Sequence, residues 1–281
     1  MKLSELRSEC VGILLRGGIE RPFYAVDLII SKVLDIERAL LITKEEMEIP
    51  AQKCVGILSM IEKRSKRVPL SYILGEAEFY GRTYGVGEGC LIPRPETELL
   101  VEEMLRACPD ASRFADWCTG SGCIGLTLLM ENNNLFGYGI DSSPKALSWA
   151  VLNTSKYNLK SRFTLILNSD PSVCDIRPGS LDFIVANPPY IPSKDVEGLM
   201  SDVKDHEPIE ALDGGEDGAD LYRLFFEHFP RFLKDGGLMG FETAGDKQAD
   251  ILVSIAPKNF VLMNRIFDYN GILRHLTWKK N

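Results

Sequence analysis

The sequence predicts an α/β fold, in which a mostly parallel β-sheet flanked by helices follows a small helical domain. From Pro95 onward, short apolar runs alternate with helical patterns, which is typical of a parallel sheet covered on both faces. The first 67 residues show only the three-to-four-residue spacing of helices. A length of 281 residues is enough for roughly two domains.

Residues 1–68 are expected to form the helical domain. Apolar side chains recur at helical spacing from Leu3 to Leu14 and from Phe23 to Val33. A third helix is predicted after Thr43, a candidate N-cap with Glu46 as its capping-box partner, with Pro50 kinking or separating its first turns. Residues 69–92 are rich in glycine and aromatic residues, which predicts a hairpin-like connector.

Residues 93–281 are expected to form the α/β domain. Helices are predicted over 99–107, from 122, from 144, and over 221–233 and 248–255. Strands are predicted over 114–118, 136–140, 163–167, 181–186 and 238–242, with a terminal pair around 261 and over 273–278.

Composition excludes several classes of protein. Seven cysteines without a C-x-x-C pair encode neither a disulfide framework nor a zinc ribbon, so we expect a cytoplasmic protein without a metal site. No apolar run is long enough for a membrane span. Residues 1–84 carry 13 basic and 12 acidic side chains, and the rest carry 19 and 28. This acidic balance disfavours direct binding of nucleic acid.

A glycine-rich turn follows the first predicted strand of the α/β domain. It reads Asp116-Trp117-Cys118-Thr119-Gly120-Ser121-Gly122 and opens a helix, where backbone N–H groups are free to bind a nucleotide-type ligand. Together with Gly125 it also spells G-x-G-x-x-G, and Asp141 follows at dinucleotide-binding spacing. An NAD enzyme therefore stays an alternative.

Three aspartates at the ends of consecutive strands favour a different ligand. Asp116 would repel a pyrophosphate but attract a cation. S-adenosylmethionine offers an ammonium and a sulfonium to Asp116, a ribose diol to Asp141, and an adenine amino group to Asp170. The alternative is that each carboxylate merely caps a turn.

The segment Asn187-Pro188-Pro189-Tyr190 follows the predicted strand over 181–186. Two prolines stiffen the loop and fix the directions of its carbonyl groups. The Asn187 side-chain oxygen, the Pro188 carbonyl and the Tyr190 ring suit a planar –NH2 group, which is either an amide or an exocyclic base amine. These acceptors would polarise the nitrogen and aim it at a methyl group without a strong base.

These motifs resemble the protein-(glutamine-N(5)) methyltransferases that modify class-1 peptide chain release factors on the glutamine of their Gly-Gly-Gln motif. The resemblance also rests on the following segments: Pro69-Leu-Ser-Tyr-Ile-Leu-Gly75, Pro93-Arg94-Pro95-Glu96-Thr97, Glu207-Pro-x-x-Ala211 and Gly214-Gly-x-Asp-Gly218. It implies a Rossmann-like, seven-stranded, mostly parallel sheet with an antiparallel last strand.

The resemblance also implies a function for each part of the chain. S-adenosylmethionine would be converted to S-adenosylhomocysteine, and residues 1–68 would help grip a release factor. The substrate glutamine would bind at Asn187, Pro188 and Tyr190, with Arg94 and Thr97 as lid candidates. Many relatives have glycine where Cys118 stands. We expect a monomer; the alternatives are methylation of an exocyclic amine of DNA or RNA, and a non-catalytic adaptor.

Overall fold

The computed structural model describes all residues 1–281 and contains two compact units. The first comprises Met1–Glu76 together with Met200–His206, and the second comprises Ala77–Leu199 and Glu207–Asn281. The break after Glu76 lies inside the predicted connector. The return of Met200–His206 to the first unit is not visible in the sequence pattern; there, an Asp202 oxygen lies 2.6 Å from a guanidinium nitrogen of Arg64.

The first unit is helical, as predicted. Its helices are α1 (Leu3–Arg16), α2 (Pro22–Leu34), α3 (Ala51–Ser65), α4 (Leu70–Leu74) and α9 (Ser201–Lys204). The helix predicted after Thr43 does not begin there, because Thr43 lies in a short 3-10 turn and α3 begins at Ala51. Of the two effects expected of Pro50, a kink or a separation of the first turns, the separation is confirmed. Pro50 is the reason: it disfavours the helical conformation of the residue before it, so the helix starts anew behind the proline.

The hairpin predicted in the connector is present. Strands β1 (Glu76–Phe79) and β2 (Arg82–Gly85) form a two-stranded sheet. The two residues between them, Tyr80 and Gly81, both have positive φ, at 51° and 69°. Two consecutive positive φ angles are the signature of a type I′ turn, whose twist matches that of the paired strands.

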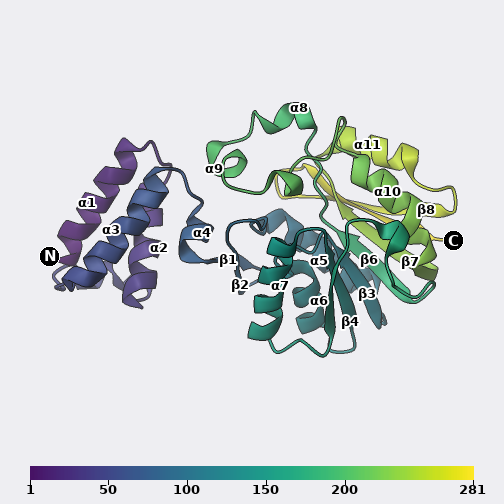
Figure 1. Cartoon of the computed structure of the whole chain (residues 1–281), viewed down its shortest axis with the longest axis horizontal. Helices are drawn as coiled ribbons and strands as arrows, with labels where there is room; N and C mark the ends of the chain where they lie inside the picture. The colour runs from purple at the N-terminus through teal and green to yellow at the C-terminus, as the bar shows by residue number, and fades with distance from the viewer. The chain divides into compact units, whose positions relative to one another are not determined.

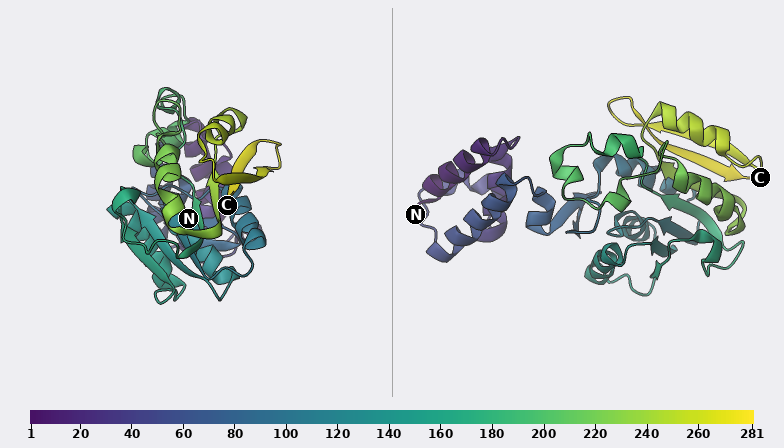
Figure 2. Two further views of the ribbon diagram at one scale, coloured as in Figure 1. Left: turned by 90° about the vertical axis from the view of Figure 1, so that its right-hand side faces the viewer. Right: turned by 45° about the horizontal axis from the view of Figure 1, so that its top comes forward.

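The second unit contains the seven-stranded sheet, in the order β5-β4-β3-β6-β7-β9-β8 (Figure 1). Its strands are β3 (Arg113–Trp117), β4 (Phe136–Asp141), β5 (Phe163–Leu167), β6 (Leu181–Ala186), β7 (Leu233–Glu242), β8 (Phe260–Phe267) and β9 (Leu273–Lys280). Strands β3 to β7 run parallel, and β9 is antiparallel to both of its neighbours. The mostly parallel sheet with an antiparallel last strand is therefore confirmed; Figure 2 shows the C-terminal pair in yellow.

Helices cover both faces of this sheet (Figure 1). They are α5 (Glu98–Ala107), α6 (Cys123–Glu131), α7 (Pro144–Lys156), α8 (Ser193–Val196), α10 (Asp220–His228) and α11 (Asp246–Ile255). One buried apolar cluster joins Phe114 of β3 to α5 and α6, and another joins Trp117 of β3 to α10 and α11. Because side chains alternate along a strand, Asp116 shares the face of Phe114 and lies toward α6.

The strand order reverses between β3 and β6. From β3 the chain builds outward through β4 and β5, and then returns to place β6 and β7 on the other side. Ligands of open α/β sheets bind at such a switch point, beyond the carboxyl ends of the strands. Asp116, Asp141 and Asn187 all lie at or just past those ends.

Candidate active site

The glycine turn between β3 and α6 has the backbone conformation of a ligand cradle. Cys118, Gly120 and Gly122 have φ angles of 60°, 55° and 80°. A Cβ atom built on Gly120 would meet nothing within 4 Å, so the backbone faces open space there. Gly122 is the N-cap of α6, whose first N–H groups have no partner within the helix. The turn therefore suits close approach of a ligand to the backbone.

Asp116 lies at the floor of this cradle and is fully buried. Its Oδ2 accepts hydrogen bonds from the Thr119 hydroxyl at 2.6 Å and from the Gly125 N–H at 2.9 Å. Its Oδ1 is buried without any hydrogen-bond partner. Burial raises the pKa of Asp116 to about 7. An unpaired buried carboxylate oxygen is costly unless a cation or a hydrogen-bond donor reaches it, so the site fits a positively charged ligand.

Asp141 ends β4 and is oriented by two backbone groups. Its Oδ2 accepts from the Gly120 N–H at 2.8 Å and its Oδ1 from the Ser143 N–H at 2.9 Å. Burial raises the pKa of Asp141 above its ordinary value. Each carboxylate oxygen keeps a second lone pair, so a diol can still be bound by both.

Asp170 lies in a different environment. It is exposed, and its Oδ1 accepts from the Ser172 N–H at 2.8 Å, capping the turn over Pro171–Val173. This hydrogen bond lowers the pKa of Asp170. The structure thus shows the turn-capping role of Asp170, and its contact with adenine stays a prediction.

The loop after β6 is held from one side by side chains remote in sequence. Asn187 is half-buried, and its Nδ2 donates to the Thr97 hydroxyl at 3.3 Å. The Tyr190 hydroxyl donates to Glu242 Oε1 at 3.2 Å. Burial and the neighbouring Glu242 raise the pKa of Tyr190, so the phenol stays protonated. Pro188 and Pro189 are buried between these two anchors.

The glycine-rich loop over 214–218 supports the other side of the Asn-Pro-Pro-Tyr loop. A Cβ on Gly214 would lie 2.7 Å from the Pro189 carbonyl oxygen, and one on Gly218 would lie 2.3 Å from the Tyr190 carbonyl oxygen. Buried Gln248 of α11 ties the two loops together, since its Nε2 donates to the Tyr190 carbonyl at 2.8 Å and to the Gly218 carbonyl at 2.7 Å. The glycines are thus required by close packing of two backbones.

The lid candidates occupy anchored positions. Thr97 is 2% exposed and donates to Glu242 Oε2 at 2.6 Å. Arg94 donates to Glu207 Oε1 at 2.6 Å, and the other oxygen of Glu207 accepts from the Ile92 N–H at 3.0 Å. These contacts fix the segment over 92–97 beside the loop after β6. A lid role for the two residues stays a prediction.

Sequence reasoning missed Glu242, Gln248 and His275. The signal for Glu242 was present, because a charged residue follows the apolar run of β7, much as Asp116 lies one residue before the end of β3. Gln248 and His275 carry no comparable signal. Each is recognisable only from its hydrogen bonds across the fold.

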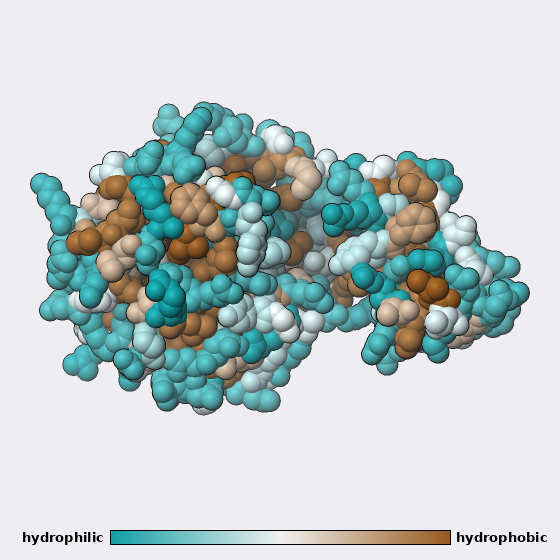
Figure 3. All heavy atoms as spheres, turned by 180° about the vertical axis from the view of Figure 1, so that it is seen from behind, coloured by the Kyte–Doolittle hydropathy of each residue, from teal (hydrophilic) through white to brown (hydrophobic).

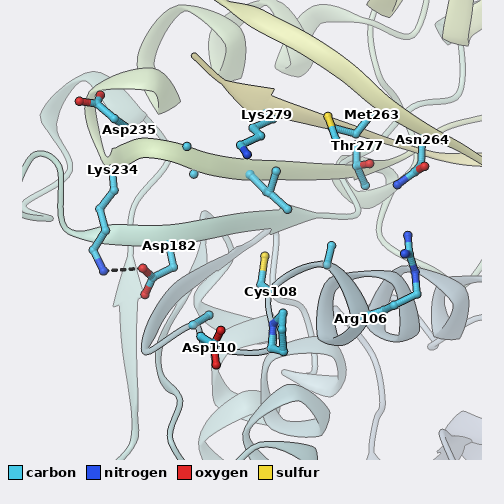
Figure 4. Close-up of a pocket in the computed structure, with 16 residues that line it drawn as sticks. Arg106, Cys108, Asp110, Asp182, Lys234, Asp235, Met263, Asn264, Thr277 and Lys279 are labelled. Atoms are coloured by element: carbon cyan, nitrogen blue, oxygen red, sulfur yellow. Dashed lines mark hydrogen bonds and ion pairs between the residues drawn. The ribbon is translucent and has the colours of Figure 1, made fainter.

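A cavity of about 540 Å³ lies at the opposite end of the sheet (Figure 4). Its lining includes Asp182 at the start of β6 and Lys234 at the start of β7, which form an ion pair, and Arg106, which pairs with Glu103. The cavity is therefore separate from the glycine turn. The charges of Lys234 and Arg106 in its lining are neutralised by their ion pairs with Asp182 and Glu103. No group of three or more His, Cys, Asp or Glu side chains is arranged to hold a metal ion.

Two family models match the chain. Residues 5–75 match the PrmC N-terminal domain, and residues 95–202 match the methyltransferase small domain.

No helix is both long and apolar enough to cross a membrane.

Whole-chain relatives cover both units. A release factor glutamine methyltransferase from Thermodesulfovibrio yellowstonii is 37% identical over 90% of this chain and 91% of its own length. A release factor glutamine methyltransferase from Clostridium acetobutylicum is 35% identical over 96% of this chain and 95% of its own length. The crystal structure of the hMettl16 catalytic domain with the MAT2A 3'UTR hairpin 6 aligns with a TM-score of 0.57 at 15% identity, covering 81% of each chain, a likeness of fold alone.

Proposed function

The chain belongs to the release factor glutamine methyltransferase family, and we propose that it methylates the side-chain amide nitrogen of the glutamine in the Gly-Gly-Gln motif of class-1 release factors. We propose S-adenosylmethionine as the methyl donor, because the buried, unpaired Oδ1 of Asp116 suits a positively charged ligand. The main support is that two features lie at the ends of neighbouring strands. Two neutral acceptors, Asn187 Oδ1 and the Pro188 carbonyl, follow β6, and the adjacent strand β3 carries Asp116, whose Oδ1 has no hydrogen-bond partner.

The residues of the glycine turn fit the methyl donor. Asp116 Oδ1 lacks a partner and would receive the ammonium of the methionine moiety, and Asp141 would bind the ribose hydroxyls. The open space at Gly120 leaves room for a ligand against the backbone. When bound, S-adenosylmethionine supplies a methyl group activated by the positive charge on sulfur.

The loop after β6 supplies what an amide nucleophile needs. Its nitrogen lone pair is delocalised into the carbonyl group, so the nitrogen attacks poorly unless its hydrogens are held by acceptors. Asn187 Oδ1 and the Pro188 carbonyl would accept these two hydrogens, and the Tyr190 ring would cover the amide plane. This arrangement aims the nitrogen and stabilises the charge that develops on it during transfer. The proton released afterwards is acidic and needs no dedicated base.

We propose that the first unit contacts the release factor. Its exposed apolar side chains include Leu15, Phe23, Tyr24, Ile42 and Val55. In Figure 3, brown side chains interrupt the hydrophilic surface of both units. The acidic balance of residues 85–281 disfavours nucleic acid as the substrate. We propose a monomeric cytoplasmic enzyme that uses no metal.

A transfer assay tests the proposed function. Labelled S-adenosylmethionine is incubated with the protein and one of three acceptors: a class-1 release factor, the same factor with the Gly-Gly-Gln glutamine replaced, or RNA and DNA. Label on the intact release factor alone is the expected result. Label on nucleic acid, or equal label on both forms of the factor, would contradict the proposal.

A further inference from the structure

Glu242, at the carboxyl end of β7, is the centre of a buried polar cluster. It is 2% exposed, and no lysine or arginine forms an ion pair with it. Its Oε2 accepts from the Thr97 hydroxyl at 2.6 Å and lies 3.3 Å from His275 Nε2, while its Oε1 accepts from the Tyr190 hydroxyl at 3.2 Å. Thr97 in turn lies 3.3 Å from Asn187 Nδ2. One carboxylate thus reaches both ends of the Asn-Pro-Pro-Tyr loop.

The directions of these hydrogen bonds follow from the chemistry of the groups. A carboxylate only accepts, so the single hydroxyl proton of Thr97 points at Glu242. The Thr97 oxygen then has only lone pairs to offer Asn187, which must present its –NH2 group. The Asn187 Oδ1 is thereby left to accept from elsewhere. His275 Nδ1 is buried without a partner, so the tautomer that leaves no buried N–H unpaired donates from Nε2 to Glu242.

The backbone around Glu242 is equally constrained. Glu242 and His275 are paired residues of the antiparallel β7–β9 ladder. The hydroxyl of Tyr222, on α10, donates to the Glu242 carbonyl oxygen at 2.5 Å. The carboxylate is therefore fixed to the sheet and not to a movable loop. Burying a carboxylate without a cation is costly, and a role in orienting the active loop would explain its presence.

We propose that Glu242 is a positioning residue, which acts through Thr97 to hold the Asn187 amide with its oxygen free for the substrate –NH2, and which holds Tyr190 directly. The inference rests on the proposed function, because it assigns Asn187 Oδ1 to the substrate amide. The opposite amide orientation would present –NH2 to the substrate –NH2, and two donors cannot bind each other. The Glu242 side chain, through its hydrogen bond with Thr97, thus selects the productive orientation without touching substrate or cofactor.

Thr97→Val tests this relay, because valine keeps the shape of threonine and removes its hydroxyl. We expect kcat to fall about 10- to 100-fold, by analogy with side chains that orient metal-ligating residues. The Kd for S-adenosylmethionine should stay within about twofold. Thr97→Ser, which keeps the hydroxyl, should restore most of the lost kcat. Glu242→Gln should reduce kcat further, because it also alters the Tyr190 contact; its thermal unfolding is recorded to exclude a folding defect.

The decisive arm repeats Thr97→Val in an Asn187→Ala background. If Thr97 acts through the Asn187 amide, its substitution has no further effect on kcat once that amide is gone. Equal fold-losses in both backgrounds, or an unchanged kcat for Thr97→Val in the wild-type background, would overturn the proposal. The wild-type rate on the release factor is measured first. A wild type that transfers no methyl group refutes the proposed function itself, so the two failures are distinct.

Discussion

The backbone N–H of Gly120 donates a 2.8 Å hydrogen bond to Asp141 Oδ2, which joins the glycine turn after β3 to the carboxylate that ends β4. The second oxygen of Asp141 is held by the Ser143 N–H at the start of α7. Two loops that each contact the expected ligand are therefore aligned before it binds. A preorganised site of this kind loses little entropy on binding.

Asp141→Asn is expected to weaken binding of S-adenosylmethionine at least tenfold. Asparagine offers only one acceptor oxygen, so its –NH2 group would meet a backbone N–H, and the charge-assisted bonds to the ribose would be lost. Isothermal titration calorimetry measures the effect. Asp110→Asn, at an exposed aspartate of the cavity at the opposite end of the sheet, is the matched control. Equal affinities in the two variants would contradict the assignment of Asp141.

Asn187→Ala is expected to leave cofactor binding nearly intact and to cut methyl transfer by about 10²- to 10³-fold, as does removal of a hydrogen-bonding group that acts in the transition state. Single-turnover rates and the Kd for S-adenosylmethionine are measured on the same preparation. A proportional loss of both would move Asn187 from substrate positioning to cofactor binding.

Affinity for S-adenosylmethionine should rise with pH through the titration of Asp116. Burial raises the pKa of this carboxyl from 3.8 to about 7, and the cationic ligand favours the ionised form. The Kd should therefore be about tenfold higher at pH 6 than at pH 8, and level off above the pKa. Asp116→Asn is the control, because the ammonium group of the ligand titrates in the same way with either protein. If the affinity of this variant had the same pH dependence as that of the wild type, the proposed role of Asp116 would be refuted.

The ligand-free protein should show the opposite trend in stability. A carboxyl whose pKa is raised on folding binds its proton more tightly in the folded state, so its contribution is complete below pH 3.8 and is lost as the pH rises through about 7. Asp116→Asn should thus raise the apo unfolding temperature at pH 8 relative to the wild type by more than at pH 5. A difference that is constant with pH would contradict this.

Cys118 occupies a left-handed conformation, with φ of 60°. Cys118→Gly should keep cofactor affinity and change the free energy of unfolding by no more than about 1 kcal/mol, since relief of strain offsets the greater freedom of glycine in the unfolded chain. Cys118→Val should lower it by about 1–3 kcal/mol, because a β-branched residue resists this conformation. Cys174→Val, at an ordinary φ of −70°, is the control in denaturant titrations. Similar losses at both positions would refute strain as the cause.

Much of the site was predictable because it follows strand ends. Asp116, Asp141 and Asn187 each end or follow an apolar run, and the carboxyl ends of parallel strands meet at one edge of a sheet. The alternation of helices and strands could be predicted from local sequence patterns alone. The seven strands and the antiparallel last strand were implied by the family resemblance, whereas the order of the strands is known only from the structure.

The supporting contacts were not predictable, because their partners are remote in sequence. Thr97 and Glu242 are 145 residues apart, and Gln248 bonds a carbonyl 58 residues away. Nothing in the pattern around Gly214 or Gly218 tells close backbone packing from a solvent-exposed turn. The start of α3 has a local cause: Pro50 separates the helix from the turn at Thr43, and local pattern alone left a kink and a separation both open.

Transfer of the methyl group to a glutamine side-chain amide is what distinguishes this enzyme from a methyltransferase of nucleic acid. Its most direct test is fragmentation mass spectrometry of the release-factor peptide that contains the Gly-Gly-Gln motif, after reaction with the wild-type protein and S-adenosylmethionine. One added methyl group is expected, located on the glutamine side chain and formed about 10²- to 10³-fold more slowly with Asn187→Ala under single-turnover conditions. A methyl group on any other residue, or an unmodified peptide from an active preparation that methylates nucleic acid, would contradict it.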